Sequence, residues 1–118
     1  MSFDLVVWDG PLPASDGDAL STFDALYSEW FEGVGDKDDR TPAPAIRQYV
    51  EALLGRWPAE DDSSPWADSP IINNAIGPIL YLGIAPSRAD EIAPECSRLA
   101  AQRGLVCFDP QSGSLRRG

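Results

Sequence analysis

Several residue types that support common catalytic and metal-binding chemistry are scarce or absent from this chain. Its 118 residues include no histidine, two cysteines and a single lysine, Lys37. Without histidine the chain lacks the commonest general base and the commonest metal ligand, so histidine-dependent chemistry is excluded. No serine lies in a G-x-S-x-G turn, and no glycine-rich phosphate loop follows a strand pattern. We therefore expect a protein that is not an enzyme and that uses no cofactor or metal.

Long apolar runs are also missing. No segment approaches the roughly 20 apolar residues that a membrane-spanning helix needs, and the initial MSFDLVVWDG lacks the basic and apolar regions of a secretion signal. The two cysteines, Cys96 and Cys107, have apolar neighbours and are expected to be buried free thiols, which suits a reducing compartment. We expect a cytoplasmic protein that forms one domain over residues 1–118 and does not bind membranes.

Acidic residues outnumber basic ones and are unevenly distributed. The chain has 19 acidic and 9 basic side chains, for a net charge of −10. Residues 1–68 hold 15 acidic and 4 basic side chains, a net of −11, whereas residues 69–118 hold 4 and 5, a net of +1. Such a charge repels nucleic acid and attracts basic proteins, although it also serves solubility alone. We expect a basic protein partner or self-association, and no nucleic acid.

The order of the apolar patterns predicts an α+β fold. Strand-like runs cover residues 3–9, 71–76, 79–85 and 105–108, and helical patterns follow Ser15 or Asp16, begin at Pro44, and end before Gly104. This order is βαββαβ with an extra helix in the first crossover, which is the ferredoxin-like pattern. Right-handed crossovers then predict an antiparallel sheet with strand order 4-1-3-2.

Two helical segments contain features that affect packing. Leu20, Phe23, Tyr27 and Trp30 recur at helical spacing and predict an apolar stripe on the first helix. Pro94 lies inside the last helix, where it removes a hydrogen bond, so we expect a kink or a broken first turn there.

Alternation along the strands predicts one aliphatic and one aromatic face of the sheet. The aliphatic parity contains Leu5, Val7, Leu80, Leu82, Ile84, Leu105 and Cys107. The opposite parity contains Val6, Trp8, Ile79, Tyr81, Val106 and Phe108. If this face is open, Trp8, Tyr81 and Phe108 are candidates for binding a partner, a second copy or a small ligand. The alternative is that the extra helix or the loop around Trp66 covers the face and makes it core.

Acidic clusters form a second group of candidate partner-binding residues. Asp36, Asp38 and Asp39 have the spacing that opens a calcium loop, but the glycine and glutamate that complete such a loop are absent. Glu60, Asp61 and Asp62 lie near Trp66, and an aromatic anchor beside acidic side chains is typical of surfaces that dock basic partners. A solvated loop with Trp66 in the core is the alternative interpretation.

Asp4 and Asp109 are expected to lie near each other because the first and last strands run antiparallel. A carboxylate pair can bind a cation or share a proton. Asp109 directly precedes Pro110 in a turn, however, which favours a carboxylate that accepts backbone N–H groups.

The C-terminal half ends in GLVCFDPQ, and this segment carries the chain's one resemblance to known proteins. Gly104, Leu105 and Val106, followed by residues 109–111 (DPQ), resemble the end of a group of small bacterial proteins of uncharacterised function that close with a GLVxxDPQ element. The resemblance implies no activity. We expect a non-enzymatic interaction module, of which immunity and inhibitor proteins are examples, that docks a basic protein. The alternative is a homodimeric or ligand-binding ferredoxin-like domain that uses the aromatic sheet face.

Overall fold

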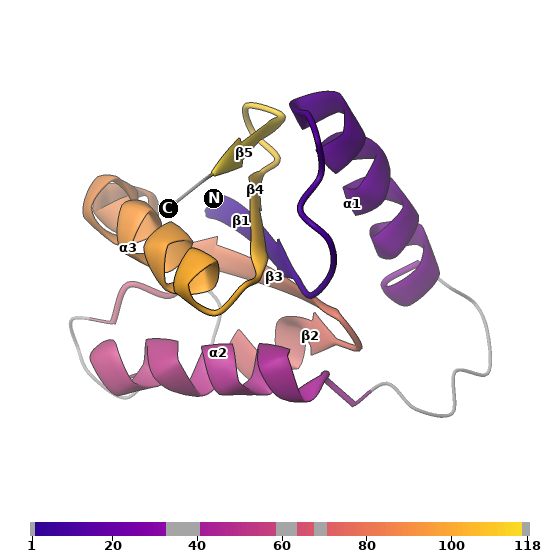
Figure 1. Cartoon of the computed structure of the whole chain (residues 1–118). Helices are drawn as coiled ribbons and strands as arrows, with labels where there is room; N and C mark the ends of the chain where they lie inside the picture. Colours follow the sequence, from indigo (N-terminus) through magenta and orange to yellow (C-terminus); the bar gives the residue numbers. More distant parts are fainter. Residues whose placement is uncertain (1, 33–40, 59–63, 68–70, 117–118) are drawn as a thin grey trace.

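The computed structural model describes residues 2–32, 41–58, 64–67 and 71–116. These residues form an α+β fold with three α-helices and a five-stranded antiparallel sheet (Figure 1). The strands are β1 (Phe3–Trp8), β2 (Ala75–Ile76), β3 (Ile79–Ile84), β4 (Val106–Asp109) and β5 (Ser114–Arg116). The helices are α1 (Asp16–Trp30), α2 (Pro44–Arg56) and α3 (Ala89–Gln102), with 3₁₀ turns at Ile71–Asn74 and Pro86–Arg88.

The sheet has the strand order β2-β3-β1-β4-β5. β1 is central: it pairs with β3, where Leu5 lies opposite Leu82, and with β4, where Val7 lies opposite Cys107. The sequence predicts four strands, and the fifth, β5, was missed. Its sequence SLR is too short to show alternation, and it pairs with β4 only because the chain reverses at Gly113, whose φ is +68°.

The division of the strands into an aliphatic and an aromatic side is confirmed. Leu5 and Val7 join a buried cluster beneath α2 and α3, whereas Val6 and Trp8 join a second cluster beneath α1 (Figure 1). Because helices cover both faces, the aromatic face is not open: Trp8 is 1% exposed and Phe108 is fully buried. The sequence left open whether this face is exposed or covered by the chain itself, and helix α1 covers it.

Helix α1 begins at a side-chain cap and packs with a different stripe from the one predicted. The Ser15 hydroxyl accepts a hydrogen bond from the Asp18 N–H at 3.1 Å, which satisfies one free donor of the first turn. Ala19 is fully buried, and Phe23 packs against the same cluster. Leu20 is 43% exposed, so its place in the predicted stripe was wrong, because the small Ala19 is the residue that faces the sheet.

Helix α3 ends at the glycine that the sequence predicts as its stop. Gly104 has φ +72°, and the N–H groups of Gly104 and Leu105 donate to the carbonyls of Ala101 and Ala100 at 3.1 and 2.9 Å. These two bonds form a Schellman motif. A 3₁₀ turn at Pro86–Arg88 precedes the helix, and α3 then runs from Ala89 to Gln102 with Pro94 inside it.

Candidate functional site

The residues predicted to bind a partner are separated by the fold. Trp8 and Phe108 are buried beneath α1, while Tyr81 is only partly buried. Trp66 is 7% exposed; its indole N–H donates to the Trp57 carbonyl at 2.9 Å, and the two indoles pack edge to face with centroids 5.9 Å apart. The core position of Trp66 is therefore confirmed. The predicted acidic residues Asp36, Asp38, Asp39, Glu60, Asp61 and Asp62 lie outside the described residues.

Asp109 has the turn function that its sequence context predicts. Its Oδ1 accepts the backbone N–H of Gln111 at 2.9 Å and that of Ser112 at 3.4 Å. The Gln111 amide then pairs with β1, because its Oε1 accepts the Asp4 N–H at 2.6 Å and its Nε2 donates to the Asp4 carbonyl at 2.8 Å. The side chain of Gln111 thereby continues the β1–β4 pairing beyond Pro110, which has no N–H to donate.

The two cysteines are free, buried thiols. Burial raises the pKa of Cys96 to about 12, with a further increase from the neighbouring Cys107. Burial also raises the pKa of Cys107 to about 11, against the opposing effects of Ser97 and Arg116. Both groups are therefore protonated at neutral pH, where a thiol is a poor nucleophile and metal ligand. Among the residues that the structure describes, no three His, Cys, Asp or Glu side chains are grouped to hold a metal ion.

A surface pocket of about 280 Å³ brings aromatic and acidic side chains together beside α1. We call it the aromatic–acidic pocket; its lining residues are Phe23, Asp24, Tyr27, Ser28, Glu32 and Tyr81. Tyr81 comes from β3, and the others come from α1 and the residues that directly follow it. Of these six, only Tyr81 was predicted as a binding residue. In the sequence, the signal for this pocket was Asp24, an acidic residue that lies between the aromatic residues Phe23 and Tyr27.

The aromatic walls of the pocket pack against one another at steep angles. The ring centroids of Tyr27 and Tyr81 are 6.2 Å apart with an interplanar angle of 65°, and those of Phe23 and Tyr27 are 5.8 Å apart at 63°. Phe31 stacks on Tyr27 with centroids 5.2 Å apart. Phe23 and Phe31 also pack against the buried cluster beneath α1, so the walls are anchored to the core.

The phenol of Tyr81 is hydrogen-bonded to a carboxylate. Its hydroxyl donates to Asp4 Oδ2 at 3.2 Å. Partial burial, followed by the charge and hydrogen bond of Asp4, raises the pKa of Tyr81 to about 12. Tyr81 is therefore a neutral ring at physiological pH, and the adjacent Asp4 adds a negative charge behind it.

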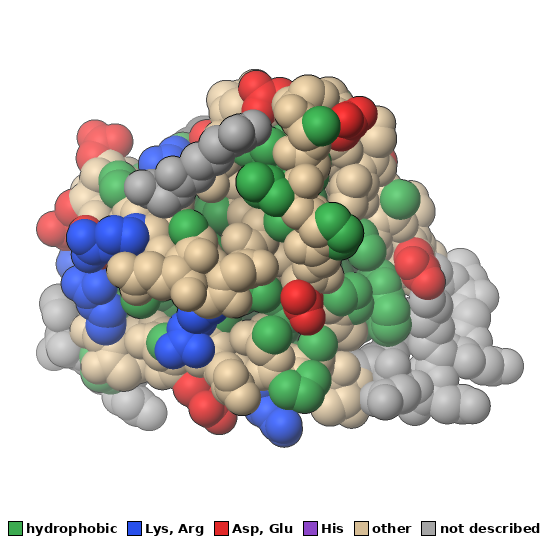
Figure 2. Space-filling view, in the orientation of Figure 1, with side chains coloured by type: hydrophobic (Ala, Val, Ile, Leu, Met, Phe, Trp, Pro, Cys, Tyr) green, Lys and Arg blue, Asp and Glu red, His purple; other side chains and the backbone are tan. Residues whose placement is uncertain are grey.

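The charges on α1 differ from those on the opposite side of the sheet. α1 contains Asp16, Asp18, Asp24 and Glu29 and no Lys or Arg. Figure 2 shows acidic side chains over the upper end of α1, whereas Lys and Arg side chains gather over α3. On that side arginine and glutamate are paired: Arg56 Nη1 lies 3.1 Å from Glu95 Oε2. On α1, Asp24 is exposed, whereas Asp16 Oδ1 accepts the Leu115 N–H at 3.0 Å.

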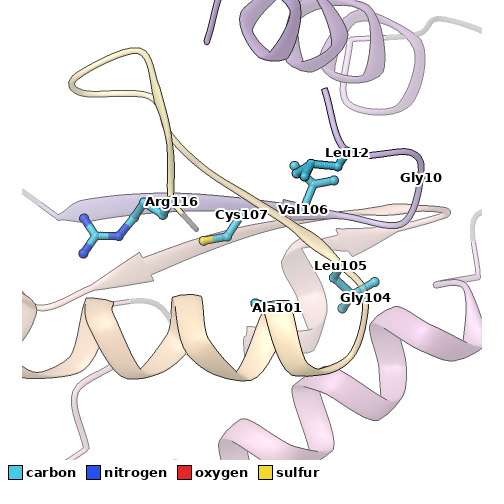
Figure 3. A pocket seen from close by; sticks show the side chains of 8 residues that line it. All are labelled: Gly10, Leu12, Ala101, Gly104, Leu105, Val106, Cys107 and Arg116. Atoms are coloured by element: carbon cyan, nitrogen blue, oxygen red, sulfur yellow. The ribbon is translucent and has the colours of Figure 1, made fainter. Parts of the chain in front are cut away.

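A second pocket, also of about 280 Å³, lies between β4, the end of α3 and the loop after β1 (Figure 3). Its lining is mostly apolar, and Leu12 at one end is 63% exposed. Arg116 lies at the other end but is already engaged, because its Nε donates to Ser97 Oγ at 2.8 Å. This pocket offers little polar chemistry for choosing a ligand.

No family model, curated protein or solved structure matches this chain. The resemblance at residues 104–111 stays a prediction. No helix within the described ranges is long and apolar enough to cross a membrane. The choice of a functional site therefore depends on the side chains themselves, and the aromatic–acidic pocket is the described site with the most specific chemistry.

Proposed function

We propose that this chain is a non-enzymatic interaction module that docks a basic protein through the exposed side of α1. The observation that carries the proposal is the aromatic–acidic pocket, where Phe23, Tyr27 and Tyr81 lie beside the carboxylates of Asp24 and Glu32. Aromatic faces and carboxylates both attract cations, and a basic side chain is the protein group that uses both.

The charge of the whole chain supports the same partner class. A net charge of −10 steers basic molecules toward the protein at low ionic strength. The acidic residues of α1 lie near the pocket, so long-range attraction and short-range contacts act on one surface. Immunity and inhibitor proteins that neutralise a basic target are examples of this function, and the buried free thiols suit a cytoplasmic location.

The proposed fold relationship is ferredoxin-like. β1, β2, β3 and β4 would form the ferredoxin-like sheet, with α2 and α3 as its two helices and with α1 and β5 as additions. The adjacency of β2, β3, β1 and β4 supports this assignment, as does the packing of α2 and α3 against the same buried cluster. In this assignment α1 is the added element, and it provides the docking surface.

Calorimetric titration with a lysine-rich peptide tests the proposed function. Binding should weaken between low and physiological ionic strength, because screening removes charge attraction. The double variant Asp18→Asn/Asp24→Asn should bind about two- to fivefold more weakly for each charge removed. The matched control is Asp90→Asn/Glu51→Gln, which removes one first-turn and one mid-helix charge from α3 and α2.

The control variant should bind like the unmodified protein, apart from a small general effect of net charge. The proposal is wrong if the peptide does not bind. It is also wrong if both double variants lose affinity equally, since the attraction would then be a property of net charge and not of α1.

A further inference from the structure

Most of the pocket is built from side chains of α1. Phe23 and Tyr27 are four residues apart, as are Asp24 and Ser28, and Glu32 follows two residues after the helix ends at Trp30. Residues four apart on a helix lie on the same face, so an aromatic row runs beside a row of oxygen acceptors. Tyr81 closes the aromatic side from the sheet. A ligand that enters the pocket contacts rings on one side and acceptors on the other.

The rings suit an apolar stem that ends in a cation. Tyr27 and Tyr81 both line the pocket and meet edge to face at 65°, while Phe31 stacks on Tyr27. Ring faces carry negative potential and attract cations within about 6 Å of their centroids. A contact of this kind occurs elsewhere among the described residues, where the Arg56 guanidinium lies 4.8 Å from the Trp57 ring centroid.

The polar row matches the donors of an ammonium group. Asp24 and Glu32 are exposed carboxylates, and Ser28 between them offers a hydroxyl oxygen. An ammonium has three donors that rotate freely, and it can use acceptors spaced along a helix. A guanidinium has five donors fixed in one plane, and it favours acceptors that meet it as a coplanar fork. One carboxylate can meet that fork alone, so the preference for lysine depends on an ammonium that uses Asp24, Ser28 and Glu32 together.

We propose that the aromatic–acidic pocket binds a single lysine side chain of the partner, with its stem on Tyr27 and Tyr81 and its ammonium on Asp24, Ser28 and Glu32. This inference depends on the proposed function, because it names the group of the basic partner that the site selects. Lysine has a four-carbon apolar stem, which packs on ring surfaces while its charged end reaches polar groups. Arginine is the competing side chain.

Nuclear magnetic resonance titration with three blocked peptides tests this selection. The probes are Gly-Lys-Gly, the same peptide with an acetylated lysine Nε, and Gly-Arg-Gly. The lysine peptide should shift the backbone amide signals of Phe23, Tyr27 and Tyr81 in a saturable way. Acetylation removes the charge, so that peptide should leave these signals unchanged. The arginine peptide should bind more weakly than the lysine peptide.

A pair of aromatic variants locates the binding without changing the net charge. Tyr27→Leu removes a pocket wall and should weaken binding of the lysine peptide about two- to fivefold. Phe31→Leu removes a ring that stacks on Tyr27 but does not line the pocket, so its affinity should stay within about twofold of the unmodified protein. Dispersed amide spectra verify that both variants are folded.

Three results overturn the inference. They are equal binding of the acetylated peptide, tighter binding of the arginine peptide, and unchanged binding by Tyr27→Leu. Any of these leaves the proposed function standing if the lysine-rich peptide still binds in a salt-dependent way that Asp18→Asn/Asp24→Asn weakens. Failure of that longer peptide to bind rejects the proposed function itself, so the two failures are distinguishable.

Discussion

The two sides of the sheet differ in what they bury and in what they leave accessible. Among the described residues, the buried cluster beneath α2 and α3 has 19 members, whereas the one beneath α1 has six. The larger cluster is mostly aliphatic and supplies most of the buried apolar area that stabilises the fold. The smaller one is surrounded by partly buried aromatic rings. If the proposed docking surface is correct, recognition uses the side of the sheet that has the smaller buried cluster.

Polar contacts on the α2 and α3 side are used internally. The Tyr49 hydroxyl donates to the Cys96 carbonyl at 2.7 Å in the interior, and Glu95 accepts from both Arg56 and Arg98 at the surface. On the α1 side, the exposed carboxylates of Asp24 and Glu32 line a pocket. This combination of aromatic rings and exposed carboxylates in one pocket is why we propose a binding surface on α1.

Truncating one leucine on each side of the sheet compares what the two sides contribute to stability. Leu82 is fully buried on the aliphatic side, and Leu82→Ala should lower the free energy of unfolding by about 2–5 kcal/mol. Leu26 is a partly buried residue of α1 that packs against the smaller cluster, and Leu26→Ala should cost less, about 1–2 kcal/mol. Urea unfolding measures both. The control Leu20→Ala, at a side chain 43% exposed, should change stability by about 0.5 kcal/mol or less.

A larger loss for Leu26→Ala than for Leu82→Ala would reverse the comparison. It would mean that α1 contributes more to stability than the aliphatic side does. The docking surface would then be part of the main stabilising unit.

Alkaline pH should weaken the aliphatic side through its two thiols. The folded-state pKa values of about 12 for Cys96 and about 11 for Cys107 lie above the ordinary value of 9.0. Their contribution to stability is complete below pH 9.0 and is lost as the pH rises through those folded-state values. Between pH 9.0 and its folded-state pKa, each thiol should lower the free energy of unfolding by about 1.4 kcal/mol per pH unit.

Unfolding at a series of alkaline pH values measures this slope. The double variant Cys96→Ala/Cys107→Ala lacks both groups and should show a shallower decline than the unmodified protein. Identical slopes would show that the thiols do not titrate with the difference expected from their burial, and that tyrosines or other groups cause the alkaline loss.

A substitution at Gly77 tests how tightly α1 is held against the sheet. Gly77 has φ +51°, and a Cβ built on it would lie 2.7 Å from Trp30 Cζ3 on α1. Gly77→Ala should cost about 1–3 kcal/mol, since it combines backbone strain with a collision against the helix. Gly104 has φ +72°, and a Cβ built on it meets no atom within 4 Å. Gly104→Ala should therefore lower the free energy of unfolding by only about 1–2 kcal/mol, from backbone strain.

Thermal unfolding compares these two variants with Gly55→Ala in α2. A Cβ on Gly55 meets no atom within 4 Å, so this variant should gain up to about 1 kcal/mol of stability from the higher helix propensity of alanine. Equal losses at Gly77 and Gly104 would show that α1 moves away from the new methyl group without cost. The packing of α1 on the sheet would then be looser than its aromatic contacts indicate.

Much of the local structure follows from short-range signals in the chain. Ser15 caps α1, Pro44 starts α2 and Gly104 ends α3, as their backbone preferences predict. The alternation along β1, β3 and β4 also assigns each side chain to the observed side of the sheet. These features depend on residues close in sequence, so a linear pattern is sufficient to predict them. β5 was missed because three residues are too few for such a pattern.

The tertiary structure decided which surfaces are covered and which groups meet. By itself, the sequence determined that one sheet face is aromatic and that the N-terminal half is acidic. It left open whether that face binds a partner, because a helix with apolar residues on several sides can pack in more than one rotation. Packing α1 with Ala19 inward buries Trp8 and Phe108. The same rotation exposes Leu20 and brings Phe23, Asp24 and Tyr27 beside Tyr81. Tyr81 lies 54 to 58 positions later in the sequence, so only long-range packing brings these residues together.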